Sequence, residues 1–313
     1  MNIVFMGSPD FAVPALERLL AGRHRVVAVV TVPDKPAGRG QQVKASAVKT
    51  CAVAAGVAVM QQEDLGDPDF IPSLAELAAD LFVVVAFRIL PPAVFNLPAS
   101  GTINLHASLL PKYRGAAPIN WALINGERET GVTTFFIEEK VDTGKILLQK
   151  KVPVADDMTA GELYAVLQQA GADLVVETVE GLADNRLQST LQTGPTSAAP
   201  KIYKEMGCID WFRSSREIYN LYRGLTPVPG VYSFHRGKLC KFLLMKPDAT
   251  ERIPQQEPGT VLHVSRQEGY FSVQTADGSV QVHRVQLEGK KPLSVNEFLR
   301  GYALDEGDRF AQT

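Results

Sequence analysis

Three polar residues in two short motifs carry side chains suited to acyl transfer. Asn104 and His106 stand two positions apart at the end of the apolar run 101–106, and Asp142 opens the later motif Asp-Thr-Gly. Residues two apart in a strand point to the same side, so we expect the amide and the imidazole to project together. A carboxylate arriving on another loop would complete a polar trio.

Such a trio suits the transfer of a one-carbon formyl group to a primary amine. Attack on the formyl carbon makes its oxygen anionic, and Asn104 together with a protonated His106 would donate hydrogen bonds to that oxygen. Asp142 would orient these groups and handle the proton that the amine loses. Taken singly, each residue is more often structural, because strand-end Asn and His bond the backbone and Asp before Thr-Gly caps a turn. Their combination favours catalysis.

The elements that position the trio follow from the pattern of apolar residues. The sequence predicts strands at 2–6, 26–32, 81–86 and 101–106, with helical patterns at 11–20, 43–56 and 68–80 between them. Continuous rather than alternating apolar strands indicate a sheet buried on both faces, hence an α/β fold with a mostly parallel sheet and helices on both faces. In such sheets the chemistry lies at the carboxyl edge of the strands.

The chain changes character after a long amphipathic helix predicted at 161–186. A stretch rich in Ser, Thr, Gln and Pro follows, and brief alternating strands divided by Gly, Pro and Asp come after it, which is typical of a small β-barrel. We expect three parts: a catalytic domain at 1–188, a linker at 189–205 and a C-terminal β-barrel domain at 206–313.

Composition limits the class of protein. The 313 residues are 45% apolar and 21% charged, which is typical of a globular chain and excludes a disordered one. The three cysteines are widely spaced with no CxxC pair, so neither a disulfide framework nor a zinc site is indicated, and a reducing cytoplasm is expected. No apolar run is long enough to span a bilayer. The net charge is −2, with a slight excess of acids before residue 200 and of bases after it.

Together these motifs resemble the folate-dependent formyltransferase family. The family's N-x-H is Asn104-Leu-His106, its S-L-L-P-x-x-R-G is the segment 108–115, and its D-T-G is 142–144. The resemblance implies a Rossmann-like folate-binding sheet, an OB-like barrel, 10-formyltetrahydrofolate as the formyl donor and no metal. It also implies that the folate site is lined by Ser108, Leu109, Leu110, Pro111, Phe87, Arg88, Ile89 and Leu90.

Within the family, the chain is most similar over its whole length to members whose acceptor is initiator methionyl-tRNA. The distinguishing feature is Pro-Asp-Lys-Pro-Ala-Gly-Arg-Gly at 33–40, a cationic loop rich in Gly and Pro. The resemblance implies that Lys35, Arg39 and Lys44 contact the tRNA, whose phosphates such a loop can neutralise. The product would be N-formylmethionyl-tRNA for translation initiation. The barrel would bind tRNA too, and a monomer is expected.

Three other functions remain open at this stage. A formyltransferase of the same chemistry could act on a small amine, such as a nucleotide sugar or glycinamide ribonucleotide, although the cationic loop is unexpected there. A hydrolase could release formate from the same donor, and an inactive RNA-binding module could retain the sheet. The segment 86–91 departs from the family pattern by being one residue shorter, which leaves open whether Arg88 touches the donor or turns to solvent.

Overall fold

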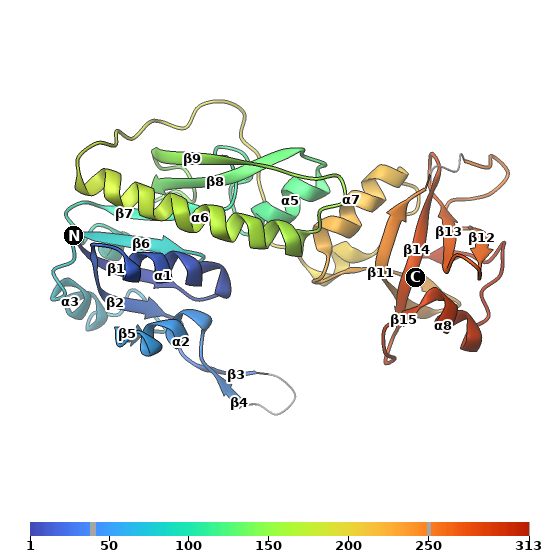
Figure 1. Ribbon diagram of the computed structural model, residues 1–313, viewed down its shortest axis with the longest axis horizontal. Helices are drawn as coiled ribbons and strands as arrows, with labels where there is room; N and C mark the ends of the chain where they lie inside the picture. The colour runs from blue at the N-terminus through green and yellow to red at the C-terminus, as the bar shows by residue number, and fades with distance from the viewer. Residues whose placement is uncertain (38–41, 249–251, 313) are drawn as a thin grey trace. The chain divides into compact units, whose positions relative to one another are not determined.

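The computed structural model describes residues 1–37, 42–248 and 252–312, which form two compact units (Figure 1). The first unit comprises Met1–Pro118, Glu129–Val154 and Tyr164–Pro200. The second comprises Ile119–Arg128, Ala155–Leu163 and Lys201–Thr313.

A seven-stranded sheet in the order β5-β2-β1-β6-β7-β8-β9 forms the centre of the first unit. Its strands are β1 (Asn2–Gly7), β2 (Arg25–Thr31), β5 (Ala58–Gln61), β6 (Leu81–Val85), β7 (Thr102–His106), β8 (Glu129–Phe136) and β9 (Ile146–Pro153). All pairs from β5 to β7 are parallel, whereas β8 and β9 add antiparallel strands at one edge. The predicted α/β fold with a mostly parallel sheet is confirmed.

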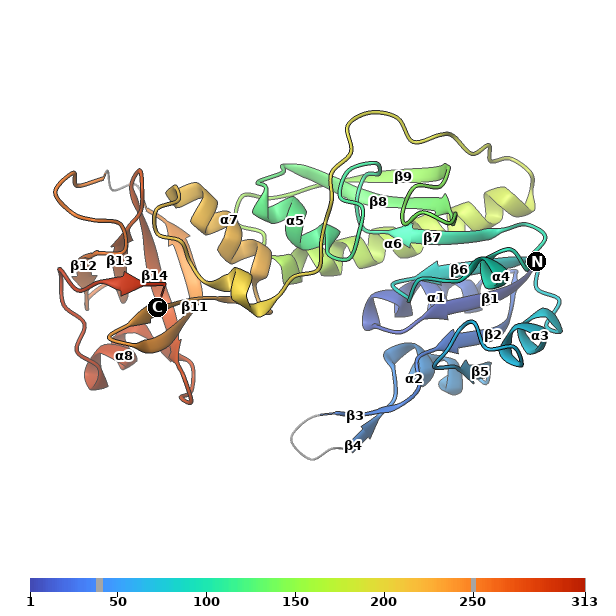
Figure 2. The ribbon, with the colours of Figure 1, turned by 180° about the vertical axis from the view of Figure 1, so that it is seen from behind.

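Helices cover both faces of this sheet. Those of the first unit are the 3-10 helix η1 (Asp10–Ala12), α1 (Val13–Ala21), α2 (Ala47–Ala54), α3 (Phe70–Ala75), α4 (Pro92–Phe95) and α6 (Ala160–Ala183), which begins in the second. On one face, Phe70 of α3 and Val94 of α4 pack with Met6 and Val84 of the sheet. On the other, α1 and α6 lie in front of the strands in Figure 1 and behind them in Figure 2.

Helix α6 packs closely against strands β7 and β8. A side chain at Gly171 of α6 would collide with Leu105 of β7, so the glycine permits the approach. Thr178 of α6 shares a hydrogen bond of 2.7 Å with Thr134 of β8. The long helix predicted at 161–186 is therefore confirmed, and it supports the strand that carries the candidate catalytic residues.

The helix predicted at 43–56 is wrong at its beginning. Residues 42–44 form a strand, β4 (Gln42–Lys44), which pairs with β3 (Lys35–Ala37) in a two-stranded sheet. Helix α2 starts at Ala47 because the Ser46 side chain accepts a hydrogen bond from the Lys49 backbone and so caps the first turn. The helix predicted at 68–80 is likewise shorter, because Ala78 takes a left-handed conformation.

The second unit contains an antiparallel sheet in the order β12-β13-β14-β11-β10-β16, with β15 paired to β14. Its strands are β10 (Val231–His235), β11 (Lys238–Pro247), β12 (Val261–Ser265), β13 (Tyr270–Gln274), β14 (Ser279–Leu287), β15 (Leu293–Ser294) and β16 (Phe310–Ala311). An antiparallel bridge between Thr260 and Arg309 joins the two ends of this order. The predicted small β-barrel is confirmed.

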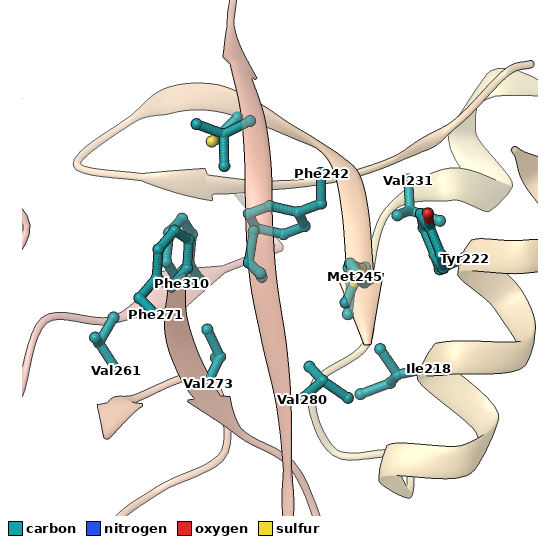
Figure 3. Packing of buried hydrophobic residues seen from close by; sticks show 14 of the residues in the cluster. Ile218, Tyr222, Val231, Phe242, Met245, Val261, Phe271, Val273, Val280 and Phe310 are labelled. Carbon is teal, nitrogen blue, oxygen red and sulfur yellow. The ribbon is translucent and has the colours of Figure 1, made fainter. Parts of the chain in front are cut away.

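Aromatic side chains fill the barrel, as Figure 3 shows. The rings of Phe271 and Phe310 stack with centroids 5.7 Å apart, and Phe242 meets Phe310 edge-on at 5.3 Å. Outside the sheet, the unit has α5 (Pro118–Ile124), η2 (Lys204–Gly207), α7 (Ser215–Leu225) and α8 (Val295–Gly301). Ile218 and Tyr222 of α7 belong to the same core, so this helix covers one end of it.

Among the described residues, no helix is both long enough and apolar enough to cross a membrane.

Candidate active site

The first two members of the predicted trio lie on the last parallel strand of the sheet. Asn104 and His106 both belong to β7, where Asn104 pairs with Val84 of β6 and His106 pairs with Thr133 of β8. They are two positions apart in a regular strand, so both side chains lie on one face. His106 is the final residue of β7 and therefore stands at the carboxyl edge.

Asp142 reaches the same place from the loop between β8 and β9. Its Oδ2 lies 3.7 Å from Nδ1 of His106 and accepts a hydrogen bond of 2.8 Å from the backbone N–H of Gly115. The side chains of His106 and Asp142 are 7% and 11% exposed. The structure thus brings a carboxylate and an imidazole together in a largely buried site, from segments 36 residues apart in sequence.

The contacts of His106 determine which ring nitrogen carries the hydrogen of the neutral imidazole. Nε2 lies 2.7 Å from the carbonyl oxygen of Tyr113, which can only accept, so Nε2 carries a hydrogen. The neutral ring consequently presents a lone pair at Nδ1, on the side of Asp142. A second proton, placed at Nδ1, makes the imidazolium and gives it a donor on that side.

Asn104 differs from its neighbours because its side chain is uncommitted. The residue is partly buried, and its amide makes no hydrogen bond to any of the described residues. Such an amide can donate a hydrogen bond to a bound molecule.

The loop that follows β7 is tied to β8 and β9. Thr133 donates to the carbonyl of Ser108 at 2.6 Å, and Gln149 donates to the carbonyl of Leu110 at 2.9 Å. Ser108 is fully buried and its hydroxyl donates to the carbonyl of Lys112. Leu110 is also buried, whereas Leu109 and Pro111 are partly exposed. The structure therefore shows Ser108 shaping its own loop.

The turn that carries Asp142 depends on a glycine. Gly144 lies against the carbonyl of Phe136, which a Cβ at residue 144 would overlap. The close approach lets Phe136 donate to the carbonyl of Lys145 at 3.0 Å, at the end of the β8–β9 pair. Asp142 itself has a φ of 55°, a left-handed conformation that costs energy in a residue other than glycine.

We expect Gly144→Ala to lower the free energy of unfolding by about 1–3 kcal/mol or more, because the added methyl forces the turn away from Phe136. Activity should fall as well, since the shift moves Asp142. Thermal unfolding and turnover of the variant, beside those of Gly301→Ala, would test this. Gly301, like Gly144, has no positive φ, but it has open space around its Cβ position, so it controls for the substitution without the collision. Equal stability of the two variants would contradict the steric argument.

The segment 86–91 after β6 also lies at the carboxyl edge. Arg88 is not turned freely to solvent: its guanidinium donates to the backbone carbonyls of Gln62 and Glu63, in the loop after β5, and lies over the ring of Phe87. Leu90 is buried, whereas Ile89 is 77% exposed. None of the described residues forms a backbone hydrogen bond with Phe87–Leu90, so these backbone groups are available to a ligand.

The cationic loop is described at its two ends only. Arg39 lies outside the described residues. Lys35 and Lys44 are exposed, and the one ion pair of Lys35 with another described residue is loose, at 3.9 Å from the exposed Glu63. Exposed cations of this kind are free to meet phosphates.

Lys49, the next cation along, is already engaged. Its ammonium lies 2.6 Å from Asp34, which also accepts from Gln61, and the hydrogen bond to Lys49 keeps the pKa of Asp34 below its usual value. This cluster ties the segment that enters the loop to the helix that follows it.

The segment 190–199, which composition marks as part of a linker, contacts both catalytic loops. Its Ser197 carbonyl accepts from the backbone of Arg114, and the Ala199 backbone donates to the Arg114 carbonyl. Gln192 bonds Arg114 and the Asp142 turn through its side chain. The sequence of this segment is polar and aperiodic. No local pattern in it indicates these contacts, so the sequence alone does not identify Gln192.

Two family models and several curated relatives match this chain over most of its length. Residues 1–179 match the family model described as formyl transferase, and residues 201–303 match that of the formyl transferase C-terminal domain. A methionyl-tRNA formyltransferase from Bacteroides thetaiotaomicron is 44% identical over 98% of this chain and 97% of its own. One from Acetivibrio thermocellus is 40% identical over the full length of both chains.

Solved structures show the same fold at lower identity. HypX from Aquifex aeolicus in complex with tetrahydrofolic acid superposes with a TM-score of 0.65 at 19% identity, covering 99% of this chain and 50% of that one. The N-formyltransferase from Helicobacter canadensis, in complex with folinic acid and dTDP-3-aminofucose, has a TM-score of 0.65 at 22% identity, covering 90% of this chain and 98% of the other.

Proposed function

The chain belongs to the formyl transferase family, and we propose that it transfers the formyl group of 10-formyltetrahydrofolate to the α-amine of initiator methionyl-tRNA. The product is then N-formylmethionyl-tRNA, used in translation initiation. Relatives named for this reaction share 40–44% of residues over nearly the whole chain, whereas WlaRD, which is named as a sugar 3N-formyl transferase, shares 21%. This difference favours the tRNA acceptor over a nucleotide sugar.

The chemical part is supported by the proximity of His106 and Asp142 at the carboxyl edge of the sheet, with Asn104 two positions before His106 on the same face of β7. In the proposed reaction the methionyl amine attacks the formyl carbon directly. Asn104, through its uncommitted amide, and His106, through Nδ1–H, donate to the oxygen that becomes anionic. Asp142 accepts the proton that the amine loses and returns it towards the departing folate nitrogen.

We assign the folate donor to the two loops beside the trio. The backbone groups of Phe87, Arg88, Ile89 and Leu90 are available to read the edge of a heterocycle, and the exposed side chain of Ile89 offers an apolar surface. Arg88 would act mainly by fixing this loop to Gln62 and Glu63. The segment Ser108–Pro111 would form the opposing wall. These features fit a flat ring with polar edges.

The tRNA is assigned to the cationic loop and to the C-terminal part of the chain. Lys35 and Lys44 are exposed at the described ends of the loop, and Arg39, which lies outside the described residues, would contact the tRNA with them. A barrel such as that of residues 206–313 suits contact with a nucleic-acid backbone. We propose residues 1–188 as the catalytic domain, 189–205 as a linker, and a monomeric enzyme that works in the cytoplasm.

The identity of the molecule that accepts the formyl group distinguishes the candidate functions. The protein would be incubated with 10-formyltetrahydrofolate labelled in the formyl group, together with charged initiator tRNA, a dTDP-linked amino sugar, glycinamide ribonucleotide or buffer alone. We expect label on methionyl-tRNA and little on the small amines or in free formate. Label mainly on a small amine, or mainly in formate, would replace the proposal by a different transferase or by a hydrolase.

We expect the affinity for initiator tRNA to depend strongly on salt. Phosphate contacts by the lysines and arginine of the loop release counterions, so the affinity should fall roughly tenfold or more between about 50 and 200 mM salt. The replacement Lys44→Ala should make the salt dependence shallower, by about one phosphate contact. Fluorescence titration of labelled tRNA at four salt concentrations would measure both slopes. An affinity independent of salt would exclude the loop as a phosphate-binding element.

A further inference from the structure

Gln192 connects the two loops on which the proposed reaction depends. Its side-chain N–H groups donate to the backbone carbonyls of Asp142 at 2.9 Å and Gly144 at 2.8 Å. Its side-chain oxygen accepts from the guanidinium of Arg114, at 2.6 Å from Nη2 and 3.2 Å from Nε. One amide thus joins the Asp-Thr-Gly turn to the loop that follows β7.

The orientation of this amide is set by its neighbours. A guanidinium has only donors, so Arg114 must face the oxygen of Gln192, and the NH₂ group is then left to face the two carbonyls. Both polar atoms of the Gln192 side chain are therefore hydrogen-bonded, and each N–H donor faces an acceptor. Few side chains other than Gln can make both kinds of bond in this arrangement.

The turn that Gln192 binds has a backbone conformation that needs support from neighbouring groups. Asp142 lies in the left-handed region with a φ of 55°, and a residue other than glycine stays there only when its surroundings over-determine the backbone. The Asp142 carboxylate is fixed at its far end by the Gly115 N–H, and its backbone carbonyl is fixed by Gln192. Together the two bonds define where Oδ2 stands relative to His106.

The strand-like pairing of the same segment keeps Gln192 in place. Ser197 accepts from the backbone N–H of Tyr113 through its hydroxyl, at 2.9 Å, and Thr190 pairs with Ile146 at the start of β9. Gln192 lies between these two anchors, so its backbone is held from both sides.

We propose that Gln192 is a positioning residue for the formyl transfer, acting through the backbone of Asp142 to hold the carboxylate at its working distance from His106. This rests on the proposed function, because it assigns the carboxylate its part in that reaction. Gln192 itself does not touch the reacting atoms. Its effect should appear in kcat and not in the binding of either substrate.

The test is Gln192→Glu, which keeps the size and the bond to Arg114 but places an oxygen against two carbonyl oxygens. We expect kcat for methionyl-tRNA formylation to fall about 10- to 100-fold, since a displacement near 1 Å can cost that much, with KM for folate and tRNA within twofold. The pH profile of kcat should also move, because the carboxylate leaves His106. Leu191→Ala is the matched control: Leu191 is the preceding residue, is 72% exposed, and should leave kcat and KM unchanged.

A double-mutant cycle with Asp142→Asn separates positioning from general stability. If Gln192 acts through the carboxylate, Gln192→Glu should cost little or nothing further in the Asp142→Asn background, measured by single-turnover formylation. An undiminished cost in that background, or a Gln192→Glu variant with normal kcat and pH profile, would overturn the inference. An unmodified protein that formylates no tRNA would instead overturn the proposed function, so the two failures are distinguishable.

Discussion

Replacing Asp142 by Asn is expected to lower kcat by about 10²–10⁴-fold, the range usual for loss of a general acid–base group. The amide oxygen of Asn can still accept the Gly115 N–H that holds the native carboxylate at 2.8 Å, so the turn should keep its shape. What is lost is a charge facing Nδ1 of His106 and a group able to take a proton.

The measurement is single-turnover formylation, with folate affinity and thermal unfolding determined on the same sample. Affinity and melting temperature should stay close to those of the unmodified protein. Near-normal turnover would show that another group takes the proton of the amine and would remove Asp142 from the mechanism.

The second large effect is expected at Asn104. Removing its amide in Asn104→Ala should lower kcat by roughly 10²–10³-fold, the cost of one missing donor to an oxyanion. Stability should change little, because the amide has no hydrogen bond to the described residues.

Asn104→Asp provides the matched control for side-chain size. It fills the same space but offers acceptors in place of the NH₂ group, so we expect it to be at least as inactive as the alanine variant. Steady-state kinetics of both variants would decide this, and an active Asp variant would contradict the donor role.

Much of the sheet was predictable because its strands are buried on both faces. The runs at β1, β2, β6 and β7 are uninterrupted apolar stretches, and their ends define the carboxyl edge at which the trio was expected. Strands β5, β8 and β9 were not predicted. Three successive residues of β9, Gln149, Lys150 and Lys151, are polar and are not buried, and a half-exposed strand at an edge lacks that pattern.

The site was predictable where it depends on local periodicity and not where it depends on tertiary contacts. Asn104 and His106 share a face because they are two apart in a strand. The arrival of Asp142 rests on its positive φ and on Gly144 packing against Phe136, which no sequence spacing reveals. Arg88 and Gln192 are fixed by backbone carbonyls of distant segments. Because every residue has a backbone carbonyl, no sequence pattern indicates these contacts.

The bond from His106 to the Tyr113 carbonyl has a consequence for proton traffic. A peptide carbonyl oxygen is too weak a base to accept a proton and pass it on, so the imidazole cannot relay a proton through Nε2. Every proton that the ring gains or gives up must therefore cross the face shared with Asp142. In the proposed reaction, the proton that the amine loses therefore leaves by way of Asp142 and not through Nε2 of His106.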